Sequence, residues 1–83
     1  MSKNKFKKVM EILEKVIKIN AIKGTNIVAR INERSLVVYD ANNDCEPVMK
    51  YGYMKEIYLQ EEWDNEFDKA VAYMHEALDQ YLA

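Results

Sequence analysis

Apolar residues recur every three or four positions near both ends of the chain and alternate with polar residues in the middle. The first periodic segment predicts a helix over about 4–23, because a 3.6-residue period places its apolar side chains on one face. Gly24 then offers a helix stop, since glycine enters the left-handed cap conformation without strain. We assign the core face of this helix to Phe6, Val9, Met10, Leu13, Val16 and Ile17, widened by Ile12 and Ile19.

A second periodic segment predicts a helix of about six turns over 61–82. Acidic residues fill its first turns, where carboxylates favour the positive end of the helix dipole. Its apolar positions keep a helical spacing throughout and predict a continuous core face. They are Trp63, Phe67, Ala70, Val71, Met74, Ala77, Leu78 and Tyr81.

Between the helices, alternating runs predict β-strands at about 25–32 and 35–40, joined into a hairpin by a short polar turn. A third strand is predicted at about 47–51, and 55–59 forms either a fourth strand or a continuation of the third. The fold class that follows is α+β, a single small domain with the order α-β-β-β(-β)-α. We expect both amphipathic helices to pack on one face of an antiparallel sheet.

With 83 residues the chain suits one domain spanning 1–83, whose thin core oligomerisation would support. Cys45 is its one cysteine, which suits a reducing compartment, and the sequence shows neither a signal-peptide run nor a membrane span. We therefore expect a cytoplasmic protein. The net charge of −2 hides an asymmetry, since residues 1–23 carry seven lysines and two glutamates, whereas 54–83 carry eight acidic residues and two lysines.

The residues that usually carry catalysis are too few to form a known constellation. One histidine, one cysteine and two glycines leave no Cys/His metal motif and no glycine-rich phosphate loop. Ser2 and Ser35 have no histidine close in sequence to act as a base. We expect a non-catalytic protein with no cofactor and no metal site.

Carboxylates gather along one ridge of the second helix, with a histidine among them. A row of this kind suits a basic partner, and the alternative is a plain solubilising face. A pH-sensitive or divalent-metal role for the histidine is a further alternative. The acidic ridge consists of Glu61, Asp64, Asp68, His75 and Asp79.

Tyrosines cluster around Gly52, more densely than a small core needs. We expect at least one to be exposed, and exposed aromatic residues are enriched at the centres of protein interfaces. Packing beneath the helices is the alternative for each ring. The candidates are Tyr51, Tyr53 and Tyr58.

The first helix begins with a run of lysines, although cations at that end oppose the helix dipole. Asp79 places a negative charge at the end of the last helix, where the helix dipole is also negative. The two mismatches cancel if the start of one helix lies near the end of the other, within a monomer or across a dimer. The alternative is that the lysines bind a nucleic-acid backbone. This basic patch consists of Lys3, Lys5, Lys7, Lys8 and Lys15.

The element order resembles that of the double-stranded RNA-binding domain. That family contacts RNA with a lysine-rich start to its last helix, where this chain has Glu61-Glu62-Trp63-Asp64, so those binding residues do not carry over. In size, acidic helical surface and lack of catalytic motifs, the chain is also similar to small phage-encoded inhibitors, including some anti-CRISPR proteins. This second resemblance implies an inhibitor of phage or mobile-element origin.

Together these patterns favour a binding or inhibitory protein that engages a protein partner through the acidic ridge and the exposed tyrosines. Nucleic-acid-processing and defence proteins are the partner classes that the resemblance implies. One alternative is a weak nucleic-acid-binding or regulatory protein that uses the basic patch. Another is a structural homodimer whose helices complete the core of each copy.

Overall fold

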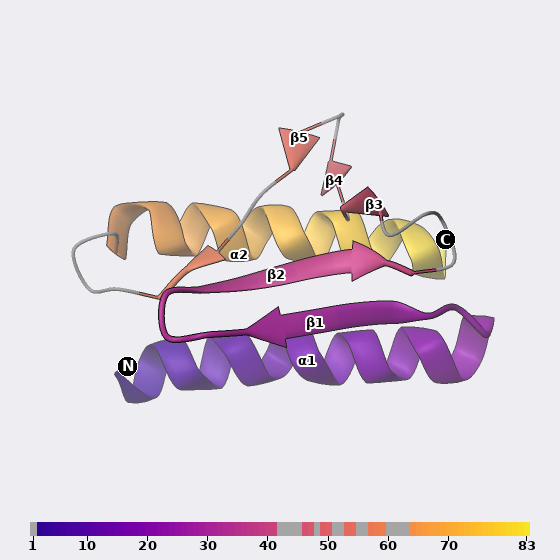
Figure 1. The fold of residues 1–83 in the computed structure, drawn as a ribbon, viewed down its shortest axis with the longest axis horizontal. Coiled ribbons are helices and arrows are strands. Elements are labelled where there is room, and N and C mark those ends of the chain that lie inside the picture. Colours follow the sequence, from indigo (N-terminus) through magenta and orange to yellow (C-terminus); the bar gives the residue numbers. More distant parts are fainter. Residues whose placement is uncertain (1, 42–45, 48, 51–52, 55–56, 60–63) are drawn as a thin grey trace.

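The computed structural model describes residues 2–41, 46–47, 49–50, 53–54, 57–59 and 64–83 (Figure 1). Two long helices lie at the ends of this chain, and short strands lie between them. The helices are α1 (Lys3–Lys23) and α2 (Asp64–Asp79), and the 3-10 helix η2 (Gln80–Leu82) extends α2. The strands are β1 (Ile27–Ile31), β2 (Ser35–Asp40), β3 (Glu46–Pro47), β4 (Met49–Lys50), β5 (Tyr53–Met54) and β6 (Ile57–Tyr58). The α+β class expected from the sequence is confirmed.

Both ends of α1 are capped, and the stop at Gly24 is the one predicted from the sequence. The Ser2 side chain accepts a hydrogen bond from the Lys5 backbone N–H at 3.2 Å, which satisfies one of the unpaired donors of the first turn. Gly24 adopts the left-handed conformation with φ of 66°, and its N–H donates to the Asn20 carbonyl at 3.0 Å. The helix therefore begins one residue before the expected range and ends where that range ends.

Strand β2 is the centre of the sheet. On one edge it pairs along its length with β1, in an antiparallel register that joins Ile27 to Asp40 and Ile31 to Leu36. On its other edge it pairs with β6 at its start and with β3 at its end, again antiparallel. The β4–β5 hairpin forms a separate two-stranded sheet.

The region expected to form a single third strand is divided between the two sheets. Glu46–Pro47 pairs with β2, whereas Met49–Lys50 turns away to pair with β5. The single expected strand over 47–51 is therefore wrong. Pro47 lacks the N–H that a continuing ladder needs, which is consistent with an early end to pairing. The expected fourth strand over 55–59 corresponds to β6, which pairs with Ser35 and Leu36 rather than extending the third.

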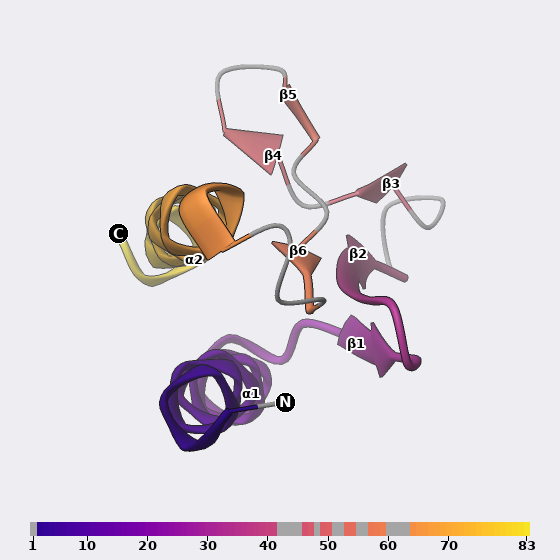
Figure 2. The same ribbon diagram turned by 90° about the vertical axis from the view of Figure 1, so that its left-hand side faces the viewer.

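Both helices lie on the same side of the sheet, and they run in the same direction (Figures 1 and 2). Between helices and sheet lies a continuous apolar core, supplied by one face of every long element. Its fully buried large side chains are Ile12, Ile19, Leu36, Ile57, Met74 and Leu78.

The face of α1 that enters this core differs from the one assigned from the sequence. Phe6, Met10 and Ile17 were assigned to the core face, yet they are 58%, 39% and 68% exposed. Because apolar residues cover more than half the circumference of α1, their spacing alone does not say which part packs against the sheet. The buried residues of the helix are Lys5, Val9, Ile12, Val16 and Ile19.

A single side chain, Asn20, holds the connection between α1 and β1. Its amide nitrogen donates to the Ile27 carbonyl, and its amide oxygen accepts from the Ile27 N–H and the Thr25 hydroxyl, each at 2.9 Å. It thus occupies both backbone groups of a residue that is only 3% exposed. The first strand therefore enters the sheet at a fixed point relative to the last turn of α1.

We expect Asn20→Ala to lower the free energy of unfolding by about 2–3 kcal/mol, because it leaves the buried Ile27 backbone groups unpaired. Chemical denaturation measures this change. Asn26→Ala is the matched control, because Asn26 is exposed in the same connection. Equal midpoints for the two variants would show that the Asn20 contacts do not stabilise the fold.

The end of the chain is attached to the end of β2 by one side-chain hydrogen bond. The Tyr81 hydroxyl donates to Asp40 Oδ2 at 2.9 Å, and Asp40 is itself buried. Burial, the hydrogen bond to Asp40 and the negative charge of Asp40, in that order, raise the pKa of Tyr81 to about 12. The folded state therefore holds this proton more tightly than the unfolded state, whose tyrosine has an ordinary pKa of about 10.

We expect Tyr81→Phe to destabilise the protein at neutral pH by about 1–3 kcal/mol, because the variant lacks the hydroxyl that donates to buried Asp40. As pH rises from about 10 to about 12, the unfolded chain loses the Tyr81 proton first, so this contribution to stability disappears. In urea unfolding across that pH window, the free energy of unfolding of the wild type should approach that of the variant. Tyr39→Phe is the control, and a pH-independent difference between wild type and Tyr81→Phe would contradict the assignment.

Candidate interaction surfaces

Two ion pairs connect the helices along their length. Lys8 Nζ lies 2.6 Å from Asp68 Oδ1, and Lys15 Nζ lies 2.7 Å from Asp79 Oδ1. The lysine later in α1 pairs with the aspartate later in α2, as expected for two helices that run in the same direction. The start of α1 therefore lies beside the start of α2, so of the open alternatives the one that brings Lys3 to Lys8 near Asp79 within a monomer is wrong. A partly exposed pair of this kind contributes about 0–1 kcal/mol.

These pairs divide the acidic ridge predicted on the last helix. Asp68 and Asp79 bind lysines of α1, although both carboxylates remain more than half exposed. Asp64 is the first residue of α2, and its side chain lies outside the described part. Glu61 lies outside the described residues. The described part of the ridge is therefore the acidic side of a mixed-charge boundary between two helices.

His75 lies on the same boundary and is half-buried. Its pKa is lowered from 6.5, first by burial and then by the positive charge of Lys15, while Asp79 and Glu11 oppose the shift. The imidazole is therefore held neutral near physiological pH. Among the described residues, no group of three His, Cys, Asp or Glu side chains is arranged to hold a metal ion.

The basic patch is also divided by the fold. Lys5 is only 5% exposed, with its ammonium 3.3 Å from the Leu59 carbonyl and 5.2 Å from the centre of the Phe67 ring. That geometry combines a hydrogen bond with a cation–π contact. Lys8 and Lys15 bind aspartates of α2, so Lys3 and Lys7 are the members that remain exposed without a described ion pair.

Of the three candidate tyrosines, the structure describes the side chain of Tyr58 alone, and it is 44% exposed on β6. Tyr51 lies outside the described residues, and Tyr53 lies on β5 with its side chain undescribed. Tyr58 stands opposite Ser35 of β2. The structure thus places one aromatic ring of the predicted cluster at the surface of the sheet.

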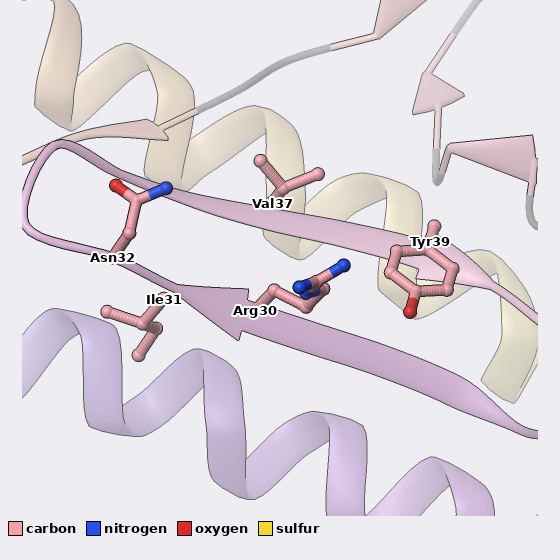
Figure 3. A pocket seen from close by; sticks show the side chains of 5 residues that line it. All are labelled: Arg30, Ile31, Asn32, Val37 and Tyr39. Atoms are coloured by element: carbon pink, nitrogen blue, oxygen red, sulfur yellow. The ribbon is translucent and has the colours of Figure 1, made fainter.

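A shallow depression lies over the hairpin of β1 and β2 (Figure 3). In Figure 3 the Arg30 side chain extends towards Tyr39, and Ile31 points towards α1. Arg30 is the one charged residue among those that line it. Its lining residues are Arg30, Ile31, Asn32, Val37 and Tyr39.

An apolar surface that was not expected from the sequence lies on α1. Phe6, Met10, Leu13 and Ile17 follow one another at spacings of four, three and four residues, which places them on one ridge of the helix. Three of them are exposed, and Leu13 is partly buried against the core. We call this ridge the α1 stripe. The signal for it was the excess width of the apolar face of α1, which is more than a single packing contact requires.

We expect the imidazole of His75 to titrate below its ordinary pKa of 6.5, and Lys15→Met to raise the pKa of His75. The variant removes a positive charge and also releases Asp79 from its ion pair, and both changes favour the imidazolium ion. Proton NMR follows the titration without ambiguity, because the chain has one histidine. Lys18→Met is the control for loss of an exposed lysine, and an unchanged pKa in Lys15→Met would contradict this electrostatic account.

The same shift makes stability depend on pH in a predictable direction. Because the unfolded chain binds the His75 proton more readily, protonation favours unfolding, and stability decreases as pH falls below about 6.5.

Among the described residues, neither helix combines the length and apolar character needed to cross a membrane. Comparison of the chain with models of known protein families, with curated proteins and with solved structures finds no match. The interaction surfaces described above are therefore the observations from which a function is inferred.

Proposed function

We propose that this protein is a non-catalytic protein-binding module that docks through the α1 stripe. One observation carries the proposal: Phe6, Met10 and Ile17 share one ridge of a helix and are all exposed. Single exposed apolar residues are ordinary, but contiguous ones usually mark a surface that another molecule covers. Spacings of four, three and four residues are typical of a helix that binds a protein through one face.

The acidic ridge supports this function less directly than the α1 stripe does. Its described aspartates already have basic partners, so a protein that bound them would have to displace Lys8 and Lys15 or share their carboxylates. Burial of apolar side chains needs no such exchange and contributes roughly 1.5–3 kcal/mol for each fully covered residue. Inhibition of the partner by coverage of its working surface is compatible with either site.

Nucleic-acid binding by the basic patch has weaker support. Each phosphate contact needs an accessible cation, and affinity grows with the number of contacts made. Lys5 is buried, and Lys8 and Lys15 are paired with aspartates. The remaining exposed pair, Lys3 and Lys7, adjoins a surface whose main character is apolar.

A photo-crosslinking residue tests the proposal without knowledge of the partner. Benzoylphenylalanine replaces Ile17 in the α1 stripe, and the matched control carries it at the adjacent exposed residue Lys18. Illumination of cells that natively express the protein should yield a discrete protein adduct from position 17 and little from position 18. No adduct at position 17, or equal adducts at both positions, would reject the α1 stripe as the docking surface.

A further inference from the structure

The charges beside the α1 stripe indicate what covers it. Lys7 and Glu14 are seven residues apart, so they lie two helical turns from each other on the same side of the stripe. Both are exposed, and neither makes an ion pair within the part of the chain that the structure describes. With Phe6, Met10 and Glu11 they line a shallow pocket at the start of the stripe.

These positions are self-complementary when two copies of α1 pack in opposite directions. If Met10 of each copy packs against Leu13 of the other, Phe6 comes opposite Ile17 at both ends of the contact. Lys7 of each copy then lies beside Glu14 of the other, and twofold symmetry forms this pair twice. In a parallel twofold pair the flank that carries Lys7 and Glu14 would instead face the opposite flank of the second helix, so these two residues could not pair with each other.

The helix dipoles favour the same arrangement. Cations in the first turn of α1 oppose its own dipole, and the structure gives Lys3 and Lys7 no described carboxylate that would offset this. In the antiparallel pair, Lys3 approaches the last turn of the second helix, near Asn20, where the dipole is negative. The mismatch that does not cancel within one chain is therefore relieved between two.

We propose that the occupant of the α1 stripe is a second copy of this chain, bound antiparallel through Phe6, Met10, Leu13 and Ile17 with two Lys7–Glu14 pairs. This inference rests on the proposed function and names its partner. It also supplies apolar burial to a domain of 83 residues, a size at which a single core is thin.

Exchange of the charges of Lys7 and Glu14 tests this arrangement. Sedimentation equilibrium over the micromolar range measures the dimer dissociation constant. We expect the wild type to form dimers in a concentration-dependent manner. Lys7→Glu and Glu14→Lys should each raise the dimer dissociation constant about tenfold, because each turns two attractive contacts into repulsive ones. The double variant Lys7→Glu/Glu14→Lys should return it to within about twofold of wild type.

Glu33→Lys is the matched control, because it makes the same charge change at an exposed residue in the turn between β1 and β2, outside α1. Circular dichroism of each variant confirms that α1 remains folded, and recovery in the double variant excludes a general loss of structure. A wild type that stays monomeric, or a double variant that stays as weak as the single ones, would overturn the second copy as occupant. In the crosslinking experiment, an adduct to a different protein would then retain the docking function while rejecting self-association.

Discussion

Pairing on both edges of β2 sets the direction of the other long elements. Strands β1 and β6 are each antiparallel to β2, so they run in the same direction as each other. Helix α1 leads into β1 and α2 follows β6, and both helices run back against those strands on one side of the sheet (Figures 1 and 2). The helices are therefore parallel, which is why Lys8 meets Asp68 and Lys15 meets Asp79. The electrostatics of the helical layer are thus a consequence of strand order.

The same arrangement limits how much of α1 can be buried. A sheet only three strands wide offers room for two helices, and α2 occupies one side of α1. Val9, Ile12 and Val16 enter the core, while the neighbouring apolar ridge remains at the surface. A helix that only covered a sheet would carry polar residues there. The apolar excess on α1 is therefore the feature that packing within one chain leaves unexplained, and it is the reason for proposing an intermolecular contact there.

Local signals in the sequence were sufficient to predict the elements that have strong hydrophobic periodicity or a clear terminating residue. Gly24 marked the end of α1, and alternation marked the β1–β2 hairpin. The failures share a physical cause, because each depended on a partner distant in sequence. The burial of Lys5 depends on Leu59 and Phe67, and the state of Asp79 depends on the relative direction of two helices. The choice between Phe6 and Val9 as core residues depends on where the sheet lies, which helical period does not encode.

The Lys5 ammonium also affects the order in which the structure can assemble. Its hydrogen bond to the Leu59 carbonyl joins residues 54 positions apart, whereas Asn20 fixes β1 to α1 over seven. Loop-closure entropy favours the short connection first, so we expect α1, β1 and β2 to form before the Lys5 contact with Leu59 does. Buried Lys5 thus connects the first turn of α1 to the segment that leads into α2. Until that contact forms, the first turn of α1 lacks its link to Leu59 and Phe67.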